Sequence, residues 1–160
     1  MLTVGGPLSE LRKESAEMAG TSVVTTPQAR YLKYLSVCTG VSSIAIGAYH
    51  FALGTASVPG AADANATVDS RERFYSAIFA GYGIAWMRAA GKSPIRADEV
   101  RLLAGLMLAG GVGRLISRAV NGRPHWFQDV LAAVEFAVPA AFLGLADAQQ
   151  KAALGAAVSD

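Results

Sequence analysis

Residues 34–62 contain no Asp, Glu, Lys or Arg. A helix needs roughly 20 apolar residues to cross the hydrocarbon core of a bilayer, and this stretch is longer. Charged residues make up 16% of the 160-residue chain, and the mean hydropathy is +0.35. A soluble domain carries about 25% charged residues, because its surface must be polar. The sequence therefore predicts one integral membrane domain rather than a soluble one.

Four apolar segments, separated by polar turns, predict the architecture. The turn signals are Pro59-Gly60, the loop KSPIRADEV, and Asn121-Gly122 followed by Pro124. We expect an all-α, four-transmembrane-helix bundle of up-down-up-down topology over residues 31–147. The predicted helices cover about 32–58, 73–91, 99–120 and 127–146. Residues 1–30 are predicted to be a polar, flexible N-terminal tail, and residues 148–160 a short C-terminal tail or a helical extension.

The second predicted helix has a short apolar part. Only 14 residues separate Arg73 from Arg88. Arginine side chains can extend toward the headgroups, so the helix can still cross the bilayer. Tyr75 and Trp86 lie near its two ends, where interfacial aromatic residues are expected.

Small residues recur on the predicted helices. Gly40, Gly47 and Gly54 are spaced seven residues apart, and Gly110 and Gly111 lie in the third helix. Small residues on one face let helices approach closely in lipid, so these five predict helix packing. The alternative is that glycine is simply frequent, since the chain has 17.

Two charges fall inside apolar segments and predict an ion pair. Arg114 lies about six residues before the third helix ends, and Glu135 about eight after the fourth begins. At about 1.5 Å per residue, their depths are about 9 and 12 Å. Because the helices are antiparallel and joined by a tight turn, we expect a bundle-facing Arg114–Glu135 pair, which costs less than isolated charges. Arg118, four residues after Arg114, is expected to reach Asp129 or a lipid phosphate.

The role of the pair has two interpretations. It is a clamp that sets the helix register, or a polar site for a proton, an anion or a lipid headgroup. His50, near the outer end of the first helix, either joins this site through water or is an interfacial residue. The ligand or ion-pair candidates are Arg114, Glu135, Arg118, His50, Tyr75 and Ser117.

Other chemistry finds no support in the sequence. No spacing of His, Cys and carboxylates matches a metal site, and no cofactor or catalytic group is predicted. The net charge of +2 and the lack of a basic stripe argue against nucleic acid. Cys38 is the single cysteine, so no disulfide within the chain is expected.

Three segments resemble a known family. DSRERFYSAIFAGYG, GGVGRLISRAVNGRP and VEFAVP are similar, in order, to motifs of an uncharacterised family of small four-helix bacterial integral membrane proteins, defined by a domain of unknown function. The resemblance covers roughly residues 32–146 and implies the architecture without an activity. The matching positions are Asp69, Ser70, Phe74, Tyr75, Gly110, Gly111, Arg114, Ser117, Gly122, Pro124, Glu135 and Pro139.

The functional prediction is a bacterial inner-membrane protein without catalytic chemistry. It would be an accessory or scaffold subunit, or would bind a lipid-like ligand between its helices. The alternatives are a small oligomeric proton-coupled transporter using Glu135 and Arg114, and a membrane enzyme acting on lipid or quinone with Arg114, His50 and Glu135. Its expected partners are the lipid bilayer and a membrane-protein complex or a second copy of the chain. More basic residues flank the N-terminus and second loop than the first and third, so both termini are expected in the cytoplasm.

Overall fold

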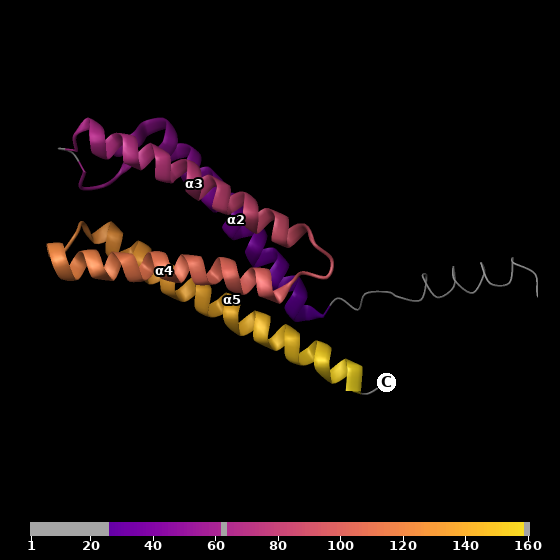
Figure 1. The fold of residues 1–160 in the computed structure, drawn as a ribbon. Coiled ribbons are helices and arrows are strands. Elements are labelled where there is room, and N and C mark those ends of the chain that lie inside the picture. Colours follow the sequence, from indigo (N-terminus) through magenta and orange to yellow (C-terminus); the bar gives the residue numbers. More distant parts are fainter. Residues whose placement is uncertain (1–25, 62–63, 159–160) are drawn as a thin grey trace, which may run out of the picture.

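The computed structural model describes residues 26–61 and 64–158, and in these ranges every regular element is helical. The elements are α2 (Pro27–Leu53), the short 3-10 helix η1 (Gly54–Ser57), α3 (Ala66–Gly91), α4 (Ala97–Asn121) and α5 (Trp126–Val158). The four long helices are antiparallel in chain order (Figure 1), which confirms the predicted all-α fold. The tail predicted over residues 1–25 lies outside the described residues.

Capping residues explain why two helices begin earlier than predicted. The Thr26 hydroxyl accepts a hydrogen bond from the backbone N–H of Ala29 at 3.2 Å, so α2 begins at residue 27 rather than 32. The Asn65 side chain accepts from the backbone N–H groups of Thr67 and Val68, so α3 begins at residue 66 rather than 73. Side chains of this kind stabilise a helix start by satisfying free N–H groups.

Two predicted helix ends were wrong. The first helix ends at Leu53 rather than at residue 58, because Gly54 has φ of 59° and leaves the helical conformation. The last helix does not end near residue 146: of the two expectations for the C-terminal residues, the helical extension is the one observed, and α5 continues to Val158. Nothing after residue 146 stops the helix until that point, since ADAQQKAALGAAV consists mainly of good helix formers.

The helices form two hairpins, and the α2–α3 hairpin is held by close backbone approach. A Cβ placed on Gly40 would lie 2.9 Å from the carbonyl oxygen of Gly83. One placed on Gly47 would lie 2.7 Å from both the Ser76 carbonyl oxygen and the Ala80 backbone nitrogen. These two glycines thus lie where α2 and α3 touch, and only a residue without a side chain fits there.

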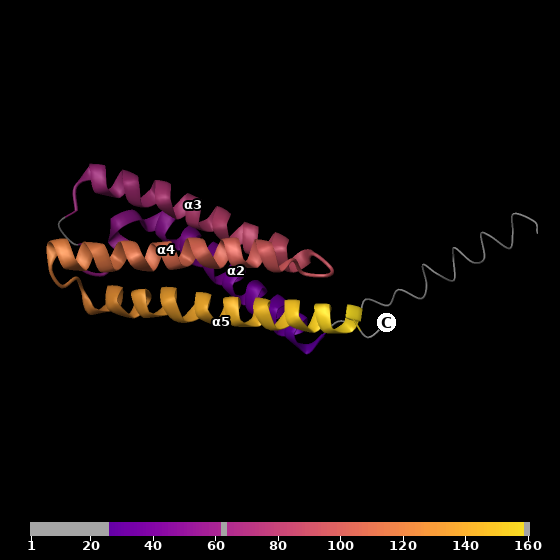
Figure 2. The ribbon, with the colours of Figure 1, turned by 60° about the horizontal axis from the view of Figure 1, so that its bottom comes forward.

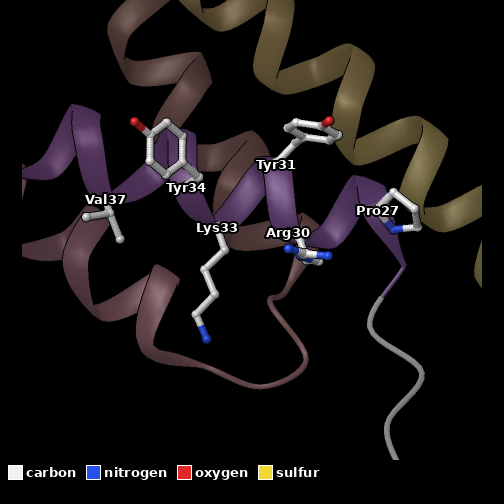
Figure 3. A pocket seen from close by; sticks show the side chains of 6 residues that line it. All are labelled: Pro27, Arg30, Tyr31, Lys33, Tyr34 and Val37. Atoms are coloured by element: carbon white, nitrogen blue, oxygen red, sulfur yellow. The ribbon is translucent and has the colours of Figure 1, made fainter.

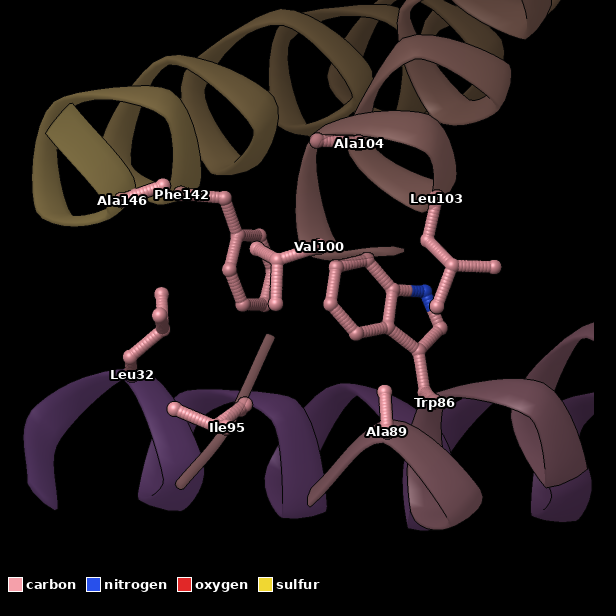
Figure 4. Packing of buried hydrophobic residues seen from close by; sticks show 9 residues of the cluster. All are labelled: Leu32, Trp86, Ala89, Ile95, Val100, Leu103, Ala104, Phe142 and Ala146. Atoms are coloured by element: carbon pink, nitrogen blue, oxygen red, sulfur yellow. The ribbon is translucent and has the colours of Figure 1, made fainter. Parts of the chain in front are cut away.

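The two hairpins meet at one end of the molecule, which we call the core end. There the ring of Trp86 on α3 stacks on that of Phe142 on α5, with centroids 4.2 Å apart (Figure 4). Both side chains are fully buried. The rest of the cluster comes from all four helices and the α3–α4 loop: Leu32, Ala89, Ile95, Val100, Leu103, Ala104 and Ala146. The core end therefore joins the start of α2 and α4 to the end of α3 and the second half of α5.

Toward the opposite end, which we call the open end, α3 and α4 diverge. Figures 1 and 2 show the separation from two directions. The α2–α3 connection and the α4–α5 turn come together again at its tip, where a Cβ on Gly60 would lie 3.0 Å from the Cβ of His125. The hairpins thus approach each other at this tip as well as at the core end.

By helix length and hydropathy, the chain is a multi-pass membrane protein. Within the described residues, three segments are long and apolar enough to cross a bilayer: Pro27–Ser57, Ala97–Asn121 and Trp126–Ala152. The prediction that α3 is a fourth such segment does not meet this measure, because its apolar part between Arg73 and Arg88 is short and contains Tyr and Gly. α3 nevertheless packs antiparallel along α2 from Gly83 to Ser76.

Candidate functional site

The site centres on Arg114 of α4 and Glu135 of α5. The Arg114 Nε donates to Glu135 Oε2 at 2.7 Å, and its Nη1 donates to the side-chain oxygen of Gln128 at 2.5 Å. The structure thus brings together the two charges that the sequence placed at similar depth, and it adds Gln128, which sequence reasoning missed. Gln128 lies seven residues before Glu135, on the same face of α5, and this spacing was its available signal.

The pair lies on the inner face of its hairpin by helical phase. Arg114 follows the buried Leu103 by eleven residues, which is about three turns, and Glu135 precedes the buried Phe142 by seven, about two turns. Each charge therefore continues a face that forms the core at the core end. The side chains of Arg114 and Glu135 nevertheless keep 35% and 21% of their surface exposed.

Arg118, one turn further along α4, pairs with the carboxylate of Asp129, which is one of its two expected partners. Arg123 reaches the other oxygen of Asp129 at 3.4 Å. Ser117 is exposed and its hydroxyl accepts from the Asn121 side chain at 3.4 Å, away from the Arg114 pair. Three arginines and two carboxylates thus gather toward the α4–α5 turn.

Aromatic side chains of α3 continue the core face toward the open end. Trp86, Tyr82, Phe79 and Tyr75 follow at spacings of four, three and four residues, which places them on one face of the helix. Tyr82 contacts Trp86 edge-on and stacks on Phe79, with centroid distances of 6.1 and 6.0 Å. Trp86 is buried, whereas Phe79 is 37% and Tyr75 is 55% exposed. We call Tyr75, Phe79 and Tyr82 the aromatic wall.

Tyr82 and Tyr75 differ in their partners. The Tyr82 hydroxyl donates to the Leu103 carbonyl oxygen at 2.7 Å and so joins α3 to α4. The Tyr75 ring lies under the guanidinium of Arg71 at 5.8 Å, a cation–π contact near the helix start. Among the hydrogen bonds of the described residues, none joins Tyr75 to the Arg114 pair.

His50 belongs to a separate cluster in the α2–α3 hairpin. Its Nδ1 lies 2.6 Å from the hydroxyl of Ser57 and 3.5 Å from Glu72 Oε1. These contacts place His50 beside α3, and its link to the Arg114 pair through water, one of its two interpretations, stays a prediction. Ser57 and Glu72 approach the same ring nitrogen, so they do not form the relay in which a base and an acid occupy opposite ring nitrogens.

The end of α2 is held by a latch that sequence reasoning missed. Arg73 pairs with Asp69 at 2.8 Å and donates to the carbonyl oxygens of Phe51 and Ala52 in the last turn of α2. Asp69 also accepts from the backbone N–H and hydroxyl of Thr55. The spacing of Asp69 and Arg73 by four residues was a visible signal, whereas their carbonyl and Thr55 partners depend on how the hairpin folds.

Asp69 lies ahead of the apolar part of α3, where water reaches it. The hydrogen bonds from Arg73 and from the Thr55 backbone lower the pKa of its carboxyl group below the usual value, outweighing the opposite effect of burial. The carboxylate is therefore stabilised in its ionised form, in which it can accept from both partners.

Three more glycines were predicted to pack helices, of which two lie on α4 and one follows the end of α2. A Cβ on Gly111 would lie 3.0 Å from the ring of Phe136 and 3.2 Å from the Cβ of Glu135, so Gly111 lies in the α4–α5 contact. Gly110 is looser, with the Glu135 carboxylate 3.8 Å away. Gly54 ends α2 instead of extending the stripe of Gly40 and Gly47, and a Cβ there would overlap the Asp69 carboxylate.

Comparison with known proteins identifies the family. No curated protein and no solved structure matches the chain. The model of the family described as a domain of unknown function, DUF4345, matches residues 31–146, which include both hairpins, the Arg114–Glu135 pair and the aromatic wall. The chain, whose described part has four long helices and three candidate membrane spans, belongs to this family, as the order of its three motifs predicted.

Proposed function

We propose that the protein binds a lipid-like amphiphile between its two hairpins, with the polar head at Arg114 and Glu135 and the apolar part against the aromatic wall. The observation that carries this proposal is that the charged pair and the aromatic wall lie on inner helix faces by helical phase and still keep part of their surface exposed. A pair serving only as a clamp would be expected to be covered by the facing helices.

The pair offers both hydrogen-bonding functions to a ligand. Among the described residues, the Nη2 group of Arg114 and the Oε1 atom of Glu135 have no partner, while Nε, Nη1 and Oε2 are occupied. A donor and an acceptor of opposite charge suit a head that carries both an oxygen acceptor and a hydroxyl or amide donor. A strongly anionic head fits less well, because Glu135 cancels the charge of Arg114.

The aromatic wall supplies the apolar part of the site. Phe79 and Tyr75 retain substantial exposure although they continue the face that is fully buried at Trp86. Pockets for small molecules combine such apolar walls with a few polar groups that fix orientation. Trp86 and Phe142 close the site toward the core end, so the length of the ligand's apolar chain is limited.

Site-specific photo-crosslinking tests the proposal. A benzophenone amino acid replaces Phe79 on the inner face or, as a control, Ile84 on the same helix; Ile84 is 54% exposed and points about 160° away from Trp86 by helical phase. After irradiation in native membranes, we expect position 79 to capture one enriched amphiphile and position 84 to capture bulk lipid. The Arg114→Leu/Glu135→Leu double variant should remove the enrichment at position 79 alone. Identical lipid profiles at both positions would overturn the proposal.

Two further experiments distinguish amphiphile binding from a subunit role and from transport. Mild extraction followed by mass spectrometry would reveal a stoichiometric protein partner if the chain is an accessory or scaffold subunit. Proton-coupled transport requires a titrating Glu135, so in liposomes Glu135→Gln would abolish proton-coupled uptake and leave the fold intact. Binding of an amphiphile that survives Glu135→Gln, without uptake by the unmodified protein, would favour the binding function over transport.

A further inference from the structure

The cations of this protein are distributed unevenly between paired and unpaired groups. At the open end, Arg73, Arg114, Arg118 and Arg123 each have a carboxylate partner, and of the described cations there only Arg71, over the Tyr75 ring, has none. At the core end, Arg30, Lys33 and Arg88 have none among residues 26–61 and 64–158. Unbalanced positive charge in the described chain is therefore concentrated where α2 begins and α3 ends.

Arg30 and Lys33 lie on the first two turns of α2 beside two exposed tyrosines. Figure 3 shows Arg30 and Lys33 projecting to one side of the helix and Tyr31 and Tyr34 to the other. Tyr31 is 66% and Tyr34 is 72% exposed. Together with Pro27 and Val37, these side chains line one open hollow, which we call the basic surface.

The basic surface lies at the boundary between water and hydrocarbon. The uncharged stretch of residues 34–62 begins directly after Lys33, so Arg30 and Lys33 are level with the headgroups when α2 spans the bilayer. Tyrosine is favoured at this depth, because its ring is apolar and its hydroxyl needs a polar partner. Arginine binds phosphate through parallel N–H donors, and lysine adds a point charge.

A second hollow with similar chemistry lies at the same end. It runs between α3 and α4, is lined by Arg88, Lys92 and Glu99, and has an apolar floor of Ala85, Ala89 and Leu103. Lys92 is paired with Glu99, which leaves the Arg88 charge uncompensated. Positive charge beside an apolar surface thus occurs twice at the core end, and both places suit a headgroup with its acyl chains.

We propose that the basic surface binds the phosphodiester of an anionic phospholipid from the adjacent leaflet. Arg30 and Lys33 hold the phosphate, a tyrosine hydroxyl donates to its oxygens, and the acyl chains lie along the uncharged part of α2. A zwitterionic phospholipid binds less well, because its own cation occupies the phosphate and meets two further positive charges. This site is separate from Arg114 and Glu135, so the result of its test does not depend on the proposed function.

The test compares lipid selectivity of the full chain and two charge-matched variants. The protein is reconstituted in vesicles of phosphatidylcholine and phosphatidylglycerol, and the lipids retained after mild extraction are counted by native mass spectrometry. Each basic residue near an anionic surface contributes about five-fold to binding, so Arg30→Gln/Lys33→Gln should lower the preference for phosphatidylglycerol roughly 25-fold. The control Arg71→Gln/Arg123→Gln removes the same charge at the open end and should keep most of the preference.

Two results would overturn the site. An unchanged preference in Arg30→Gln/Lys33→Gln would show that these side chains do not select the lipid. An equal loss in both double variants would show that only the net charge of the protein matters. Because all four replaced side chains project from the surface, far-ultraviolet circular dichroism should show the same helix content in both variants, and this check keeps a folding defect apart from lost binding.

Discussion

A double-mutant cycle across Arg114 and Glu135 measures what the pair contributes to stability. Removing one partner of a buried ion pair costs about 3–5 kcal/mol, because the other charge is left uncompensated. Here both side chains are partly exposed, and Gln128 continues to accept from Arg114 when Glu135 is lost. We therefore expect about 2–3 kcal/mol for Glu135→Leu and about 3–4 kcal/mol for Arg114→Leu, which leaves the carboxylate without a donor among the described residues.

The double variant Arg114→Leu/Glu135→Leu should recover most of this loss. Two leucines suit an apolar helix contact, so the double variant is expected within about 1 kcal/mol of the unmodified protein. The coupling free energy then amounts to several kcal/mol, above the range of about 0.5–3 kcal/mol that residues in contact usually show. Arg123→Leu serves as the control, since Arg123 is 74% exposed and should change stability by less than about 0.5 kcal/mol.

Trp86 provides the readout for this cycle. It is fully buried in the stack with Phe142, so its fluorescence reports separation of the hairpins. A Trp126→Phe background removes the other tryptophan, and unfolding is followed in mixed micelles as the fraction of sodium dodecyl sulfate rises. If the two single losses simply add in the double variant, the pair is not coupled and the ion-pair reasoning is refuted.

Three further predictions test the packing, the latch and the topology. Gly47→Ala should destabilise the protein by about 1–3 kcal/mol in the same unfolding assay, because its Cβ would overlap the backbone of α3, whereas Gly81→Ala, with nothing within 4 Å, should be neutral or stabilising by up to about 1 kcal/mol. Because the pKa of Asp69 is lowered, its ionised carboxylate stabilises the folded state at pH values above 3.8, the usual pKa of the group. This stability is lost as the pH falls from 3.8 through the lowered pKa. Unfolding midpoints should therefore drop more steeply with acid in the unmodified protein than in Asp69→Asn, and parallel curves for the two proteins would contradict the latch. In a Cys38→Ser protein, a cysteine at position 93 in the α3–α4 loop should react with a membrane-impermeant maleimide from the cytoplasmic side; labelling from the periplasmic side alone would reverse the proposed orientation.

Several local features could be predicted from the sequence because they depend on neighbours in the chain. The number and antiparallel order of the helices follow from apolar segments separated by turn signals at Pro59-Gly60 and Asn121-Gly122. The depth match of Arg114 and Glu135 follows from counting residues on either side of one tight turn. The sequence left open whether residues 148–160 extend the last helix, since the polarity changes there while the helix-forming composition continues, and the structure extends α5 to Val158.

The arrangement of the two hairpins was decided only by tertiary structure. Apolar periodicity assigns a face to each helix, but it does not say how far that face stays covered, and here the stack of Trp86 on Phe142 closes one end while Phe79 and Tyr75 remain exposed at the other. His50 illustrates the same limit: its depth allowed an interfacial residue or a link to the Arg114 pair through water, and only the packing of α2 on α3 shows its contacts with Ser57 and Glu72. Sequence determines which residues share a helix face and a depth, because the α-helix has a fixed rise and period. Which faces then meet depends on the fit of side chains between helices distant in sequence, such as a glycine against a carbonyl or an indole against a phenyl ring.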